Sequence, residues 1–122
     1  MKVAFVPWDD SVMKDRMFTP GYSGYKDSHI VFAEEMEKLG YEIHTIDMYK
    51  NLKEADLFLF SKMNYRWLNK VMREHLLNRA VYCSAEPPVV VPWNCAEGYE
   101  KLLHIFSNIL TWNDDMVATP RI

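Results

Sequence analysis

Short apolar runs alternate with segments of helical periodicity along this chain, and this alternation is the feature that most constrains its fold. The runs are residues 3–6, 41–46, 56–60, 80–83 and 109–112, and apolar side chains recur at helical spacing in residues 29–39, 67–76 and 99–106. Short, mostly apolar strands are typical of parallel sheets that are buried on both faces. The pattern therefore predicts βαβ units that build a three-layer α/β/α sandwich around a mostly parallel sheet of about five strands.

The best-defined helix is expected in the first of these helical segments. Either Asp27 or Ser28 can act as its N-cap, and Gly40 can end it, because glycine tolerates the left-handed conformation that follows a helix. Its inner face is expected to carry His29, Phe32, Ala33, Met36 and Leu39. Glu34, Glu35, Glu37 and Lys38 are expected to face water.

Size and charge limit the classes of protein to which the chain can belong. Its 122 residues, of which 49% are hydrophobic, suffice for one compact domain. The 14 basic and 17 acidic side chains give a net charge of -3, which argues against nucleic acid as a partner. No apolar run is long enough to span a membrane, and the first residues do not resemble a signal peptide. Cys83 and Cys95 are too few for a disulfide framework, which favours a reducing cytoplasm.

Three loops follow the predicted strands on the side where ligands bind in open parallel sheets. They are residues 7–27, 61–64 and 84–94. The first contains Tyr22 and Tyr25 beside two glycines, and aromatic rings of this kind can stack on the CH groups of a sugar, although a plain surface loop explains them equally well. An acidic pair, Asp9 and Asp10, follows the first strand and is read as a solvated turn.

The third loop has the most unusual sequence, because Glu86 stands just beyond a buried strand and is followed by Pro87 and Pro88. The prolines fix φ and disfavour helical geometry in the residues before them, so they hold the carboxylate at the binding edge of the sheet. A carboxylate held there can act as a general base. The alternative is a solvated glutamate without a role. Trp93 and Asn94, which end the loop, are candidate contacts to a sugar acceptor.

Two segments of the final third of the chain resemble the signature run of the family 10 glycosyltransferases, the fucosyltransferases. They are residues 85–88, with the sequence Ala-Glu-Pro-Pro, and residues 105–115, with the sequence Ile-Phe-Ser-Asn-Ile-Leu-Thr-Trp-Asn-Asp-Asp. In that family a Glu-Ser-Pro or Glu-Pro-Pro element precedes a Phe-containing helix and a Leu-Thr-aromatic strand. The order and the spacing of these elements are similar here.

The resemblance implies a GT-B-type enzyme, in which two Rossmann-like domains face each other across a cleft. Residues 1–122 would be the N-terminal, acceptor-side domain of an inverting fucosyltransferase, and Glu86 the base that deprotonates a glycan hydroxyl. GDP-fucose would be bound mainly by a C-terminal domain absent from this chain, so that the isolated domain would be inactive. No cofactor or metal is expected in this half. The lack of an anchor favours a bacterial, cytoplasmic relative, at most peripheral to the inner face of the membrane.

Three other interpretations compete with this one. Asp114 and Asp115 could pair to bind a divalent metal, but a strand-end cap explains them more simply. A phosphate-receiving signalling domain needs an aspartate after the third strand, where the chain has Ser61 and Lys62. A non-catalytic carbohydrate- or partner-binding α/β module remains the open alternative to the enzyme.

Overall fold

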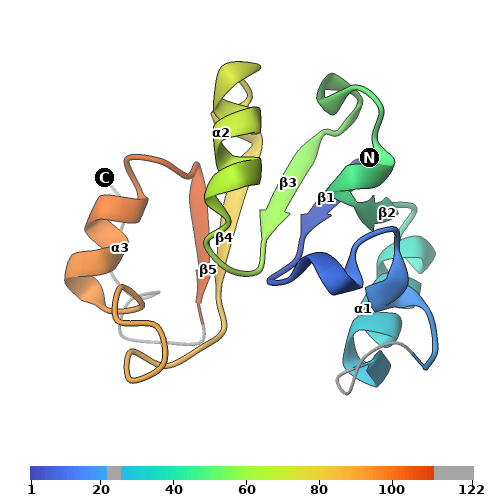
Figure 1. Cartoon of the computed structure of the whole chain (residues 1–122), viewed down its shortest axis with the longest axis horizontal. Helices are drawn as coiled ribbons and strands as arrows, with labels where there is room; N and C mark the ends of the chain where they lie inside the picture. The colour runs from blue at the N-terminus through green and yellow to red at the C-terminus, as the bar shows by residue number, and fades with distance from the viewer. Residues whose placement is uncertain (22–25, 112–122) are drawn as a thin grey trace.

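The computed structural model describes residues 1–21 and 26–111, and it confirms the α/β, Rossmann-like fold (Figure 1). The sheet has five strands, all parallel, in the order β2-β1-β3-β4-β5. The strands are β1 (Lys2–Val6), β2 (Glu42–Thr45), β3 (Leu57–Phe60), β4 (Ala80–Ser84) and β5 (Asn108–Thr111). The chain moves from β1 outward to β2 and then returns past β1 to β3, so the direction of winding reverses between β1 and β3.

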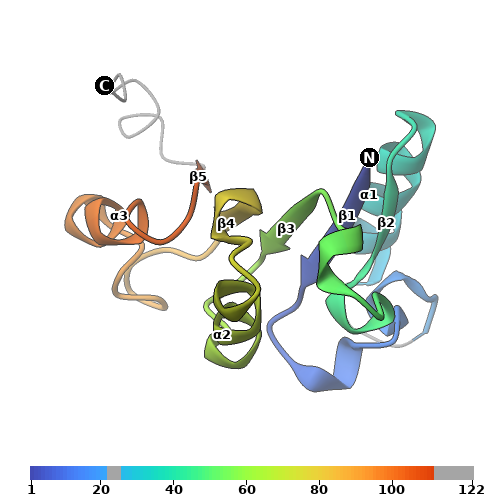
Figure 2. The ribbon, with the colours of Figure 1, turned by 90° about the horizontal axis from the view of Figure 1, so that it is seen from above.

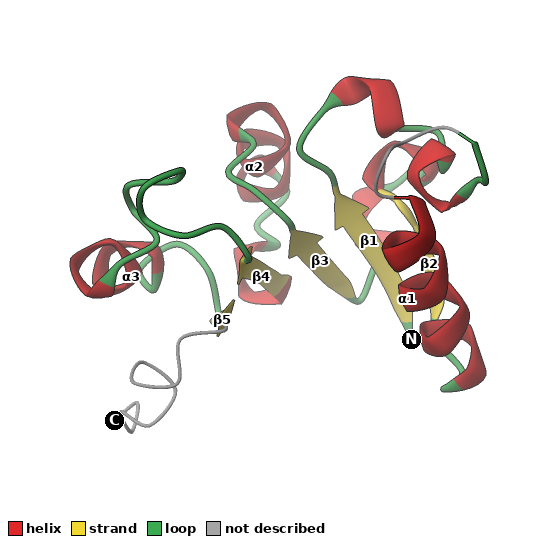
Figure 3. Ribbon diagram, turned by 90° about the horizontal axis from the view of Figure 1, so that it is seen from below, coloured by secondary structure: helices red, strands yellow, loops and turns green. Residues whose placement is uncertain are grey.

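Three α-helices cover the two faces of this sheet, as Figures 2 and 3 show from opposite sides. Helix α1 (Lys26–Lys38) packs with Ala33 against Val3 and Phe5 of β1. Helices α2 (Tyr65–Arg73) and α3 (Ala96–Leu102) pack on the opposite face, together with the segment that joins β2 to β3. The arrangement is the three-layer sandwich that the alternation of elements predicts.

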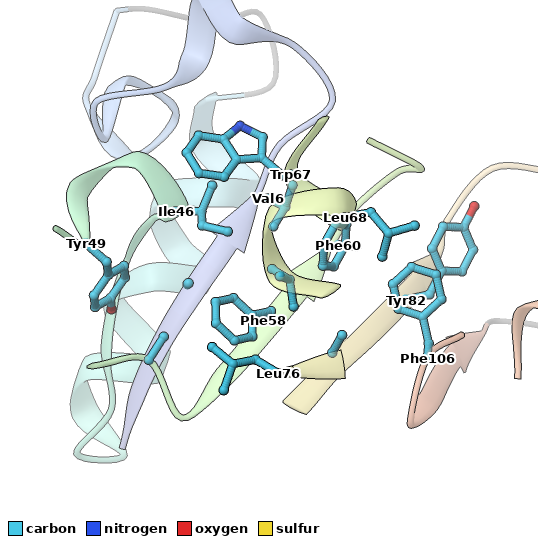
Figure 4. Close-up of a cluster of buried hydrophobic side chains, with 14 of the residues drawn as sticks. Val6, Ile46, Tyr49, Phe58, Phe60, Trp67, Leu68, Leu76, Tyr82 and Phe106 are labelled. Carbon is cyan, nitrogen blue, oxygen red and sulfur yellow. The ribbon is translucent and has the colours of Figure 1, made fainter. Parts of the chain in front are cut away.

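The larger hydrophobic cluster lies between the sheet and helices α2 and α3 (Figure 4). Alternate residues of β1 and β3 enter it, because successive side chains of a strand point to opposite faces. Its buried members include Val6, Phe58, Phe60, Trp67, Tyr82 and Phe106. Phe106 lies beyond the end of α3, and its ring contacts those of Phe60 and Tyr82.

Helix α1 differs from its prediction at both ends. It begins at Lys26, so Asp27 and Ser28 lie within the helix and neither is its N-cap. Phe32 and Leu39 were expected on the inner face but are 36% and 71% exposed. The reason is that α1 packs mainly against β2 and the 3₁₀ turn Arg16–Phe18, so that Ala33 is buried while Phe32 lies at the rim, with its ring centroid 6.4 Å from that of Phe5. Leu39 follows the end of the helix, next to Gly40, which has φ of 87°.

Helices α2 and α3 are shorter than the periodicity predicts. In α2 the side chain of Asn64 caps the first turn by accepting a hydrogen bond from the Trp67 amide, at 3.3 Å. The helix ends at Arg73, and His75 takes a φ of 59°, which turns the chain so that Leu76 returns to the core. Within the ranges 1–21 and 26–111, no helix has the length and apolar character that crossing a membrane requires.

Candidate functional site

Glu86 lies two residues beyond the end of β4, on the exposed part of the loop that leads to α3. Its carboxylate makes no hydrogen bond or ion pair with any residue of the described ranges 1–21 and 26–111. The side chain is therefore not committed to an internal partner. It stands at the carboxyl end of the sheet, the side on which ligands of such folds are bound.

A buried polar network holds the backbone of this loop from beneath. Asn94 is only 3% exposed, and its side-chain amide donates a hydrogen bond to the carbonyl oxygen of Glu86 at 2.7 Å. The Tyr82 hydroxyl donates to the side-chain oxygen of Asn94 at 2.9 Å, and the Trp93 indole donates to that hydroxyl at 3.0 Å. Both ends of the loop are thereby tied to β4, and the backbone at Glu86 is fixed.

Backbone turns complete the shape of the loop. The amides of Val90 and Val91 both donate to the carbonyl of Pro87, at 2.9 and 3.0 Å, and the amide of Asn94 donates to Val91. Val91 is buried, whereas Val89 is 90% exposed. The loop is thus a compact turn anchored by one inward valine, and the two prolines stiffen its start.

A second chain of hydroxyl groups joins the ends of β4 and β5 to α3. The hydroxyl of Tyr99, in α3, forms hydrogen bonds with the hydroxyls of Ser84 and Thr111, which are paired across the two strands. Ser84 is 2% exposed and Tyr99 3% exposed, so the bond between them lies out of water, whereas the bond to Thr111 is partly buried. Neutral hydroxyls that exchange hydrogen bonds in a buried site add rigidity without a charge.

Burial also favours the protonated form of the Tyr82 hydroxyl. Its pKa is raised, chiefly because burial disfavours the charged phenolate, while the hydrogen bonds from Trp93 and with Asn94 act in the opposite direction. The hydroxyl therefore stays protonated and remains a donor to Asn94. The network beneath the loop keeps its hydrogen-bonding pattern over the range of pH in which a carboxylate base works.

The structure brings together some of the residues predicted for the site. Trp93 lies beside the network, and 37% of its surface is exposed, so its ring remains accessible next to the loop. Asn94 lies beneath the loop and not on its surface. There its side chain holds the Glu86 carbonyl in position. Tyr22 and Tyr25, Trp112 and the acidic pair Asp114 and Asp115 fall outside the described residues. Asp9 accepts a hydrogen bond from the Ser11 amide and caps a solvated 3₁₀ turn, Asp10–Val12. Its pKa is lowered by hydrogen bonding to Ser11, first with the side chain and then with the backbone amide.

Comparisons of sequence and of structure identify no family for this chain. The chain matches no protein-family model, no curated protein and no solved structure at a significant level. In the part of the chain that the structure describes, no three His, Cys, Asp or Glu side chains converge in a way that could hold a metal ion.

One cluster of polar groups has no counterpart in the sequence-based predictions. Asp15 accepts hydrogen bonds from the backbone amide of Thr45 and from the Nδ1 of His44, both at 2.6 Å, and Glu42 lies 3.2 Å from the other ring nitrogen of His44. Asp15 adopts the left-handed conformation, with φ of 57°. The contact joins the loop after β1 to the edge strand β2 across 29 residues of sequence, and no local sequence signal indicates such a pair.

This cluster makes the stability of the protein depend on pH. Burial alone would lower the pKa of His44, but the hydrogen bonds and charges of Asp15 and Glu42 outweigh it and raise the pKa above 6.5. A raised pKa stabilises the folded state fully below the unfolded pKa, and the contribution is lost as pH rises through the folded pKa. We expect His44→Gln to destabilise the protein more at about pH 5.5 than at about pH 8.5, by less than about 1 kcal/mol because the pair is partly exposed.

Urea unfolding of both proteins at the two pH values measures this difference. The matched control is His104→Gln, because His104 is exposed on the other side of the fold. The same pH dependence in both variants would contradict the role of Asp15 and Glu42.

The polar network also predicts a loss of stability when Asn94 is replaced. Asn94→Ala leaves the buried Tyr82 hydroxyl without its acceptor and the Glu86 carbonyl without its donor. We expect the free energy of unfolding to fall by about 2 kcal/mol, the usual cost of unpaired buried polar groups. Asn69→Ala, on the exposed face of α2, should change it little. Urea denaturation measures both, and equal small effects would show that the network carries little energy.

Proposed function

We propose that this chain is the acceptor-side domain of an inverting glycosyltransferase of the fucosyltransferase type, with Glu86 as general base. The carboxylate takes the proton of a glycan hydroxyl as that oxygen attacks the anomeric carbon of GDP-fucose. A new glycosidic bond forms on the face opposite GDP, and the bond to the diphosphate breaks, with GDP leaving with the electron pair. The configuration at the anomeric carbon is inverted.

The observation that carries this proposal is an exposed carboxylate, without a partner among residues 1–21 and 26–111, on a loop whose backbone is fixed. Asn94 holds the Glu86 carbonyl from below, and Pro87 and Pro88 stiffen the chain that follows. A general base must lie within hydrogen-bond reach of the proton that it removes, so a fixed backbone lowers the entropic cost of reaching that geometry. A glutamate without such support would sample many positions in solvent.

The neighbouring aromatic ring supports a sugar as the ligand. Trp93 presents part of its ring to solvent while its nitrogen is held by Tyr82. A ring held in this way offers an apolar surface to the CH groups of a sugar at little entropic cost. The resemblance implies that a second domain, outside this sequence, binds the donor nucleotide. This second domain is part of the proposal.

A transfer assay tests the proposal. The full-length gene product is mixed with GDP-fucose and a panel of galactoside acceptors. The amount of fucose transferred is then measured for the unaltered protein and for the Glu86→Gln variant. Loss of transfer in the variant is the supporting result, provided that the variant folds normally.

A non-catalytic binding module is the second candidate, and one observation favours it. The tip of the same loop exposes apolar side chains, with Val89 at 90% and Val90 at 59% exposure, next to two prolines. Exposed apolar groups of this kind often contact a partner. If the module is correct, Val89→Ser and Val90→Ser weaken binding to the glycan or partner, and Glu86→Gln does not.

A further inference from the structure

A pocket lies at the point where the winding of the sheet reverses, away from Glu86. It has a volume of about 270 Å³, and it is lined by Asp10, Met13, Lys14, Asp47, Arg66 and Trp67. The first three residues belong to the loop after β1, Asp47 follows β2, and Arg66 and Trp67 are in the first turn of α2, which follows β3. In open parallel sheets, the crevice outside the carboxyl ends of the strands at such a reversal is the usual place for a ligand.

An unpaired donor lies at this pocket. The indole nitrogen of Trp67 is buried and has no hydrogen-bond partner in residues 1–21 and 26–111, and the side chain as a whole is only 8% exposed. Figure 4 shows the nitrogen on the side of the ring away from Phe58 and Leu76, toward the carboxyl end of β1. An indole N–H can only donate, and an unpaired buried donor costs about 1–3 kcal/mol. The group that relieves this cost must present a hydrogen-bond acceptor, such as an oxygen atom.

Two cations, Lys14 and Arg66, and two carboxylates, Asp10 and Asp47, line the pocket. The ammonium group of Lys14 has no partner among the described residues. Arg66 contacts Asp10 at 3.4 Å, and both side chains are more than 60% exposed, at 62% and 70%, so that this pair is weak. Both oxygens of the Asp47 carboxylate accept a hydrogen bond from the backbone amide of Lys14, at 3.0 and 3.2 Å. The N-terminal end of α2 adds a partial positive charge.

We propose that this pocket binds a small ligand through a negatively charged oxygen, a phosphate or a carboxylate, which accepts a hydrogen bond from Trp67 and pairs with Arg66 and Lys14. Because the nitrogen is buried in the unliganded protein, binding requires a local shift of the side chains that line the pocket, among which Met13 is flexible. Arg66 exchanges its weak contact with Asp10 for the ligand. The site is independent of Glu86 and of the proposed transfer reaction.

Nuclear magnetic resonance of the indole N–H groups tests the site directly. The Trp67 resonance is assigned with Trp67→Phe, which removes the N–H and keeps an apolar ring, and the protein is then titrated with inorganic phosphate and, separately, with acetate. We expect the Trp67 resonance to move in a saturable manner with at least one of the two anions. Arg66→Gln should weaken that binding about tenfold, and Lys14→Gln by a smaller factor.

Matched variants and solutes separate this site from general effects. Lys70→Gln removes a cation that lies 4.3 Å from the centre of the Trp67 ring and does not line the pocket, so it should leave the affinity unchanged. Sodium chloride at equal ionic strength should not move the resonance. A resonance that stays fixed with both anions, that moves equally with glycerol, or that responds to phosphate equally in Arg66→Gln would overturn the proposal.

Discussion

Replacing Glu86 with glutamine is expected to lower fucose transfer by at least about 100-fold, the smaller end of what a positioned general base contributes. Glutamine keeps the size and the polarity of the side chain but cannot accept the proton of the acceptor hydroxyl. The donor is expected to bind elsewhere, so the KM for GDP-fucose should stay near its original value while kcat falls. Initial rates at varied GDP-fucose and acceptor concentrations measure both constants.

Glu97→Gln is the matched control for this experiment. Glu97 is an exposed acid in the first turn of α3, close in sequence to the same loop. The Glu97→Gln protein should therefore retain full activity. Circular dichroism and urea unfolding show whether each variant is folded. Full transfer activity in a folded Glu86→Gln protein would remove the base from the mechanism, and the binding module would then be the better account.

Gly98→Ala is expected to destabilise the protein by about 3 kcal/mol, the upper range for overpacking a buried position. A Cβ atom at Gly98 would lie 1.8 Å from the carbonyl oxygen of Trp93 and 2.5 Å from its carbon. Both are backbone atoms, so no side-chain rotation can relieve the contact. Either α3 or the loop that carries Trp93 and Asn94 must move, and the network under Glu86 is disturbed with it.

Urea denaturation of Gly98→Ala and of two comparison variants tests this contact. Glu97→Ala changes the neighbouring exposed position and should have little effect. Gly40→Ala has no atom within 4 Å of the new Cβ, but the φ of 87° makes alanine strained, so a loss of about 1 kcal/mol is expected. A Gly98→Ala protein as stable as Glu97→Ala would show that α3 is not packed closely on the loop.

Most of the fold follows from the sequence because local patterns determine it. Apolar runs such as residues 57–60 lie where both faces of the sheet are covered, and periodic segments form the helices that cover them. The ends of the helices are harder to predict from the sequence. The exposure of Phe32 depends on how much of the sheet α1 covers, and the return of Leu76 to the core depends on the left-handed turn at His75.

The site was predicted only in part, for a related reason. The position of Glu86 after a buried strand is visible in the sequence, as is the stiffness that two prolines give. The bond from Asn94 to the Glu86 carbonyl is not, because it depends on the turn made by the residues between them. The pairing of Asp15 with His44 and the unpaired nitrogen of Trp67 likewise depend on contacts between segments that are distant in the sequence.

The order of the strands has a consequence for how the protein folds during synthesis. β1 is made first but lies inside the sheet, paired with β2 on one side and with β3 on the other. One edge of β1 therefore stays unpaired until the ribosome has released the chain through Thr45, and the other until it has released the chain through Phe60. Such long-range pairing slows folding and exposes aggregation-prone surface on the nascent chain. Early protection by a chaperone should matter more for this chain than for a helical bundle of the same size.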